Sequence, residues 1–141
     1  MKAPNNKKES TINIGLGTQC FLTSIPSSWE GLDAVTNIPF INDCTSLTSI
    51  PDSWEGFGAL AAVSQMFLNC TSLTNCGTIF TGLAKATEVS SLFDGCTGMQ
   101  GDIHALYTYL STKPIAVQYY SYCFRGCTQA VGYGSIPSSW K

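Results

Sequence analysis

Cysteine is the residue type in this chain most able to do chemistry, and its spacing is regular. Seven cysteines occur in 141 residues, and four of them, separated by 26, 26 and 31 residues, are Cys44, Cys70, Cys96 and Cys127. The closer pairs, Cys70-x5-Cys76 and Cys123-x3-Cys127, do not match the paired knuckle spacings of structural zinc sites. We therefore predict no metal site. This regular spacing indicates repeated coils that stack on one another, in which equivalent cysteine side chains point in parallel rather than at each other. Such an arrangement is poor geometry for a disulfide. We therefore expect seven free thiols, with a native disulfide as the alternative.

Other catalytic groups are sparse. His104 is the only histidine, and Gly15-Leu16-Gly17 lacks the third glycine and the lysine of nucleotide-binding loops. No Gly-x-Ser-x-Gly elbow is present, and serines such as Ser138 and Ser139 fit helix-start hydroxyls. The sequence therefore predicts a protein that is not an enzyme and that uses no cofactor.

Charge and hydropathy exclude two further classes of partner. The net charge is −2, and no lysine or arginine lies between Lys8 and Lys85. A groove that follows phosphates needs clustered cations, so we expect no nucleic-acid binding. No run of 18 apolar residues occurs, so we expect no membrane span, and the polar residues 1–9 do not form an export signal.

Internal repeats are the strongest pattern in the sequence. Ile-Pro-x-Ser-Trp occurs at residues 25–29, 50–54 and 136–140, and a second block, Phe-x-x-Cys-Thr, occurs at residues 67–71, 93–97 and 124–128, with Ile in place of Phe at residues 41–45. The proline ends any strand pairing and is suited to begin a helical turn. Five aromatic residues in register, separated by 25, 26, 27 and 33 residues, mark five coils; they are Trp29, Trp54, Phe80, Tyr107 and Trp140. We expect the tryptophans to pack inside rather than to form an external platform for sugars.

The pattern Met-Phe-x-x-Cys-Thr-Ser-Leu-Thr at residues 66–74 resembles the BspA-like leucine-rich repeats, over about residues 19–141. This resemblance implies a repeat solenoid: a leucine-rich-repeat-like right-handed coil with short parallel strands and short helical turns. We expect a polar N-terminal arm at residues 1–11, one solenoid at residues 12–141 and an irregular, expanded last coil at residues 103–136. The resemblance also implies an adhesive role, typical of bacterial surface proteins.

The uneven placement of tyrosine indicates where a partner binds. All six tyrosines lie after residue 106, together with the only arginine. Tyrosine and arginine are enriched at binding surfaces because they bury a large area at a low ordering cost. The alternative is that some of these tyrosines pack inside the last coil. The predicted binding residues are Tyr109, Tyr119, Tyr120, Tyr122, Arg125 and Tyr133.

These observations favour a non-enzymatic recognition or adhesion module that binds a protein or a glycan. The expected settings are the surface of a bacterium, if a leader is missing from this chain, or a phage particle. The alternative is a structural subunit of a virion or tail, assembled in the cytoplasm, that docks neighbouring subunits. We also expect self-association through an uncapped C-terminal coil, because a final coil with one neighbour exposes an apolar face.

Overall fold

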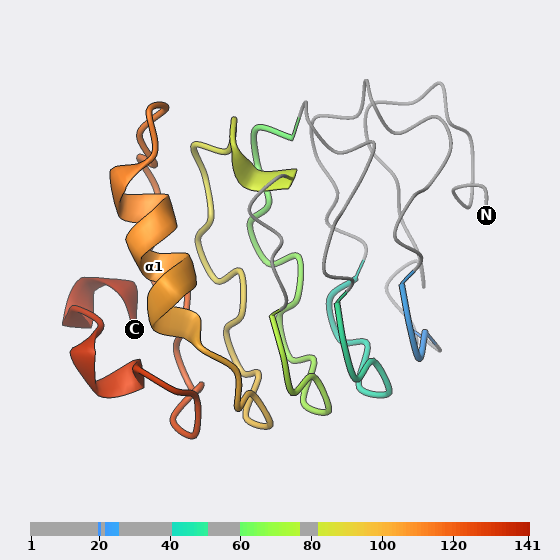
Figure 1. The fold of residues 1–141 in the computed structure, drawn as a ribbon. Coiled ribbons are helices and arrows are strands. Elements are labelled where there is room, and N and C mark those ends of the chain that lie inside the picture. Colours follow the sequence, from blue (N-terminus) through green and yellow to red (C-terminus); the bar gives the residue numbers. More distant parts are fainter. Residues whose placement is uncertain (1–19, 21, 26–40, 51–59, 77–81) are drawn as a thin grey trace, which may run out of the picture.

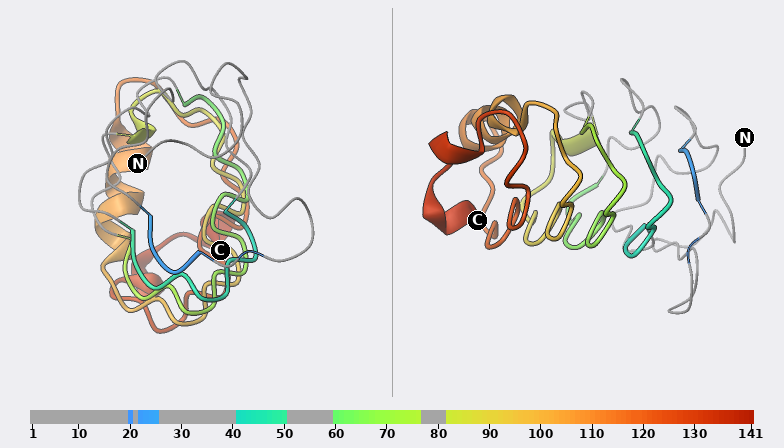
Figure 2. Two further views of the ribbon diagram at one scale, coloured as in Figure 1. Left: turned by 90° about the vertical axis from the view of Figure 1, so that its right-hand side faces the viewer. Right: turned by 90° about the horizontal axis from the view of Figure 1, so that it is seen from below.

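The structure is a computed structural model that describes residues 20, 22–25, 41–50, 60–76 and 82–141. These residues contain one α-helix, α1 (Ile103–Thr112), and the 3-10 helices η2 (Tyr133–Ser135) and η3 (Ser138–Trp140). Successive windings of the chain lie side by side in sequence order (Figure 1), and viewed end-on they surround a common interior (Figure 2). No helix among the described residues is long and apolar enough to cross a membrane.

The predicted fold class, a leucine-rich-repeat-like solenoid with short parallel strands, is wrong. The described residues form no strand and therefore no sheet, and neighbouring windings meet in isolated parallel bridges such as Ala62↔Glu88 and Glu88↔Tyr119. Backbone conformation explains the difference. Gln65 and Ser91 have φ angles of +62° and +57°, in the left-handed region that ends an extended run. The extended backbone that a strand requires is thus interrupted after a few residues, although main-chain hydrogen bonds between the windings continue beyond these positions.

Three equivalent segments carry most of the contacts between windings: residues 61–69, 87–95 and 118–126. The first donates to the second through Val63 N–H to Glu88 O (2.9 Å) and through Phe67 N–H to Leu92 O (2.9 Å). The second segment donates to the third in the same register, for example from Phe93 N–H to Cys123 O at 2.8 Å. Each segment is therefore fixed to the next by main-chain hydrogen bonds.

A row of stacked aromatic rings runs through the interior of these segments. The rings of Phe67 and Phe93 lie 5.3 Å apart at 6°, and those of Phe93 and Phe124 lie 6.2 Å apart at 9°. Trp140 continues the row beyond Phe124 at 6.3 Å and is itself buried. This confirms interior packing for the third Ile-Pro-x-Ser-Trp copy, while Trp29 and Trp54 lie outside the described residues.

Buried thiols form a second ladder beside the aromatic row. Cys70, Cys96 and Cys127 each donate a hydrogen bond to a carbonyl oxygen of the preceding winding, at 3.3, 3.0 and 3.3 Å. Cys76 and Cys123 are also free and buried. Burial raises the pKa of Cys70 and of Cys127 to about 12, because the thiolate is desolvated. These thiols are neutral and are poor nucleophiles.

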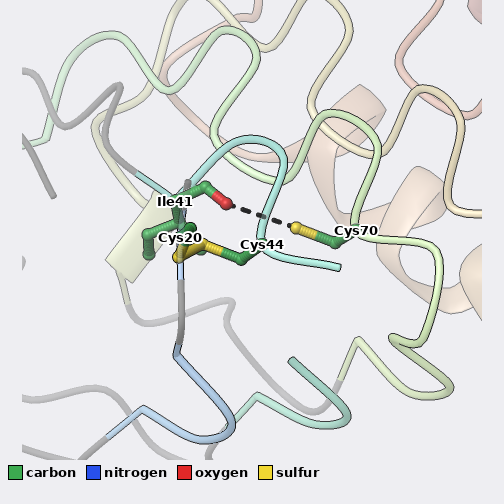
Figure 3. Close-up of a disulfide and its surroundings, with 4 residues drawn as sticks. All are labelled: Cys20, Ile41, Cys44 and Cys70. Atoms are coloured by element: carbon green, nitrogen blue, oxygen red, sulfur yellow. Dashed lines mark hydrogen bonds between the residues drawn. A yellow bond between two sulfur atoms is a disulfide. The ribbon is translucent and has the colours of Figure 1, made fainter. Parts of the chain in front are cut away.

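The prediction of seven free thiols is wrong for Cys20 and Cys44, which form a disulfide (Figure 3). Their Cα atoms are 4.7 Å apart, within the range that a disulfide requires. The prediction assumed that equivalent cysteines stack in parallel. Cys20 does not share the 26-residue spacing of the ladder, so the two side chains point toward each other instead.

Helix α1 lies within the expanded region predicted at residues 103–136. Asp102 accepts a hydrogen bond from Ala105 N–H at 3.0 Å and so begins the helix, and Ile103, Leu106 and Leu110 form its buried face. Lys113 follows the helix and is buried; its ammonium donates to the carbonyls of Ala86 (2.6 Å), Ala84 (3.4 Å) and Ile115. Burial lowers the pKa of Lys113. The predicted arm at residues 1–11 lies outside the described residues.

Within the predicted last coil Tyr119, Tyr122 and Val131 are exposed, whereas Phe124 is not. Its N–H donates to Trp140 O at 2.9 Å, and its side chain is fully buried. The ring of Trp140 stacks on Tyr120 at 4.5 Å and 12° and meets Tyr107 edge-on at 5.2 Å. Residues 136–141 therefore cover the end of the aromatic row.

Candidate binding site

A cavity of about 460 Å³ lies between the third segment and the C-terminal residues. One wall is formed by residues 118–122, which include three of the predicted binding residues: Tyr119, Tyr120 and Tyr122. Ser138, Ser139 and Lys141 form the other wall. The volume falls within the range of pockets that hold small organic ligands.

Tyr119 and Tyr122 present aromatic surface to solvent beside this cavity. They are 60% and 47% exposed. Tyr119 makes no side-chain hydrogen bond or ring contact with the part of the chain that the structure describes. Tyr122 has a φ of +61°, an uncommon conformation for a bulky residue and equivalent to that of Gln65 and Ser91. The backbone therefore holds an exposed tyrosine at a position where a smaller residue would be less strained.

Arg125 supports Tyr122 from one side. Its guanidinium lies 4.1 Å from the centre of the Tyr122 ring and binds both carboxylate oxygens of Asp94, at 2.9 and 2.6 Å. The hydrogen bonds to Asp94 raise the pKa of Arg125, which stays charged. Asp94 is buried and belongs to the preceding segment, so this pair fixes the cation over the ring.

The remaining predicted residues are arranged differently. Tyr120 is half-buried, because one face of its ring stacks on Trp140. Tyr133 begins η2 and packs beneath Lys141, whose ammonium lies 4.7 Å from the ring centre and donates to Tyr133 O at 3.3 Å. Tyr109 is half-buried on α1 against the core. Neither Tyr133 nor Tyr109 lines the cavity.

The sequence did not identify the opposite wall of the cavity. Ser138 and Ser139 were expected to be helix-start hydroxyls, but no side chain caps η3, and both residues are exposed. The available signal was the third Ile-Pro-Ser-Ser-Trp copy itself, which places two hydroxyls beside a buried tryptophan. Gln118 and Lys141 carried no signal in the sequence.

The cavity offers recognition groups rather than catalytic ones. Its lining contains aromatic rings, hydroxyls, one amide and one ammonium, and it contains no histidine, carboxylate side chain or thiol. Among the described residues, no group of three or more histidine, cysteine, aspartate or glutamate side chains is arranged to hold a metal ion.

Comparison of the chain with models of protein families, with curated protein sequences and with solved structures found no significant similarity. The resemblance to BspA-like repeats therefore stays a prediction.

Proposed function

We propose that this protein is a non-enzymatic recognition module that binds a protein or a glycan through the cavity beside Tyr119 and Tyr122. The observation that carries the proposal is the exposure of these two aromatic side chains on the wall of one cavity. Tyrosine supplies a large contact area with only two side-chain torsions to immobilise, so it binds partners at a low entropic cost.

The backbone behind the cavity supports this function because it holds the tyrosines in place. Val89 N–H donates to Tyr119 O at 2.7 Å, and Ser91 N–H donates to Ser121 O at 2.9 Å. Arg125 and Asp94 hold Tyr122 from the side. A surface fixed in advance pays less ordering free energy when a partner binds.

The lining of the cavity supports recognition over catalysis. General acid–base or nucleophilic catalysis requires a titratable group close to a reacting atom, and the lining supplies only serine and tyrosine hydroxyls with the ammonium of Lys141. The buried thiols elsewhere are protonated, because burial raises the pKa of Cys76, for example, to about 11.

Immobilised arrays of linear peptides and of oligosaccharides test this proposal. The variant Tyr119→Ala/Tyr122→Ser places at each position a residue found in an equivalent position of this chain, Ala62 and Ser91, so folding should be retained. We expect the array ligands of the parent protein to bind the variant at least tenfold more weakly.

Val131→Ser is the matched control, since Val131 is 59% exposed but does not line the cavity. It should bind as the parent does. If neither array yields a ligand, or if ligands bind the double variant and the parent equally, the proposal is wrong.

A further inference from the structure

The three equivalent segments allow the main-chain hydrogen bonds to be followed from one winding to the next. In the first segment, Val63 N–H donates to Glu88 O at 2.9 Å and Gln65 N–H donates to Ser90 O at 3.0 Å. Two donors that are two residues apart are thus paired with two carbonyl groups that are also two residues apart.

The second segment repeats this arrangement. Val89 N–H donates to Tyr119 O at 2.7 Å, and Ser91 N–H donates to Ser121 O at 2.9 Å. The donors Val89 and Ser91 follow Val63 and Gln65 by 26 residues. The register is therefore the same at both interfaces.

In the third segment the same groups have no partner among the residues that the structure describes. Tyr120 and Tyr122 occupy the positions of Val89 and Ser91, and their N–H groups donate to no residue of the described chain. The acceptor is also without a partner. In the second segment, Thr87 O accepts from Gln118 N–H (2.7 Å) and from Tyr119 N–H (3.2 Å). Gln118 occupies the position of Thr87 in the third segment, and its carbonyl oxygen accepts no hydrogen bond from the described residues. Two donors and one acceptor thus lie along the cavity wall.

The C-terminal residues fill only part of this edge. Trp140 O accepts from Phe124 N–H at 2.9 Å, in the place where Cys123 O accepts from Phe93 N–H. The residues before Trp140 form η3 and do not run extended along residues 118–122. The cavity lies along this edge, between residues 118–122 and Ser138, Ser139 and Lys141.

We propose that this cavity binds an extended peptide segment of a partner protein, parallel to residues 118–122, through Gln118 O, Tyr120 N–H and Tyr122 N–H. This inference rests on the proposed function and names its ligand class. We place the peptide in the register seen between the first and second segments and between the second and third. In this register, the N–H groups of the first two residues of a four-residue stretch of the peptide donate to Gln118 O. The carbonyls of its second and fourth residues accept from Tyr120 and Tyr122. Such main-chain pairing provides affinity independent of the peptide's sequence, and the tyrosine side chains select among sequences.

The positions of these groups favour a peptide over a glycan. The donors of Tyr120 and Tyr122 repeat with the two-residue period of an extended peptide, in the register that the chain itself uses twice. Sugar hydroxyls have no such period. Trp140 already fills the next carbonyl position, so the bound peptide ends or turns away after four residues.

The test begins with a phage-displayed library of random linear octapeptides selected against the full chain. The best peptide is synthesised, and its affinity is measured by calorimetry together with that of versions N-methylated at each residue in turn. We expect methylation at two adjacent residues, those that donate to Gln118 O, to weaken binding at least tenfold. At saturation, hydrogen exchange of the Tyr120 and Tyr122 amides should slow at least tenfold, while that of Val89 and Ser91 should be unchanged.

Each other outcome overturns the inference. A selected peptide that leaves the Tyr120 and Tyr122 amides unprotected binds in another way. Binding of oligosaccharides but not of peptides, weakened by Tyr119→Ala/Tyr122→Ser, would retain the proposed function and replace the peptide by a glycan. Protection of the two amides that rises with protein concentration alone would identify a second copy as the occupant. If neither peptides nor oligosaccharides bind, the proposed function is wrong as well.

Discussion

The second segment, residues 87–95, and the third, residues 118–126, follow the same backbone course but have different partners. In the second, the N–H groups of Val89, Ser91, Phe93 and Gly95 all donate to the next winding. In the third, only Phe124 among the equivalent donors does so within the described chain. The comparison shows how one main-chain pattern joins neighbouring windings in the interior and, at the third segment, leaves donors without a partner among the described residues, where we propose that a peptide binds.

The side chains differ in the same way. Ser91 and Tyr122 share a left-handed backbone, with φ angles of +57° and +61°. The left-handed conformation costs about 1 kcal/mol or more for a residue other than glycine or asparagine. The exposed tyrosine that Arg125 holds at this position fits the binding role that we propose.

Phe93→Ala should give the largest loss of stability. Phe93 is fully buried between Phe67 and Phe124, so truncation removes two stacked contacts and leaves a cavity. We expect the free energy of unfolding in urea to fall by about 4 kcal/mol. Tyr119→Ala in the third segment is the contrast, with an expected change within about 0.5 kcal/mol. Similar losses for the two variants would contradict the division between packing and binding segments.

Removal of the disulfide should have the next largest effect. Cys20 and Cys44 are separated by 24 residues, and the chain-entropy relation for a loop of this length predicts a loss of about 3 kcal/mol for Cys20→Ser/Cys44→Ser. Thiol titration of the unfolded parent supplies the control: five groups should react without reductant and seven after reduction. Seven reactive groups without reductant would show that the disulfide does not form.

Alkaline pH should destabilise the thiol ladder. The pKa of Cys70 is raised to about 12 in the folded protein from an ordinary value of 9.0. Between these values the unfolded chain loses its proton while the folded protein keeps it, so stability falls as pH rises. At pH 10 each such thiol should cost about 1 kcal/mol relative to pH 8. Cys70→Ala should have a shallower pH dependence than the parent in urea titrations at both pH values; an unchanged slope would contradict this account.

Arg125→Met should have only a small effect on stability, because the ion pair of this exposed guanidinium is screened by solvent. The loss should shrink in high salt. Its effect on the third segment should be larger: the Tyr122 side chain loses the cation above its ring, and its NMR signals should broaden or shift. A Tyr122 spectrum identical to that of the parent would show that Arg125 does not hold the ring.

Some features of the fold could be predicted from the sequence, and others could not. The spacing of Cys70, Cys96 and Cys127 predicted a ladder, because equivalent residues of stacked windings share one environment. The strands were predicted wrongly because Gln65 and Ser91 adopt the left-handed backbone conformation, which ends an extended run. Glutamine and serine are not residue types that indicate this conformation in a sequence. The resemblance to BspA-like repeats reinforced the same expectation.

The candidate site was predictable only in its side chains. Tyr119, Tyr120 and Tyr122 stood out by composition. The free N–H groups of Tyr120 and Tyr122 depend on the path taken by residues 136–141, and main-chain pairing across windings leaves no trace in residue types. Half of the site is therefore visible only in three dimensions.

Hydrogen exchange of the free protein tests whether the main-chain edge of the third segment is unpaired. The amides of Val89 and Ser91 should exchange at least about 100-fold more slowly than in an unstructured peptide, because each is bonded to the third segment. The equivalent amides of Tyr120 and Tyr122 should exchange within about tenfold of the unstructured rate. Equal protection of all four amides would contradict the account, because it would show that the edge of the third segment is already paired.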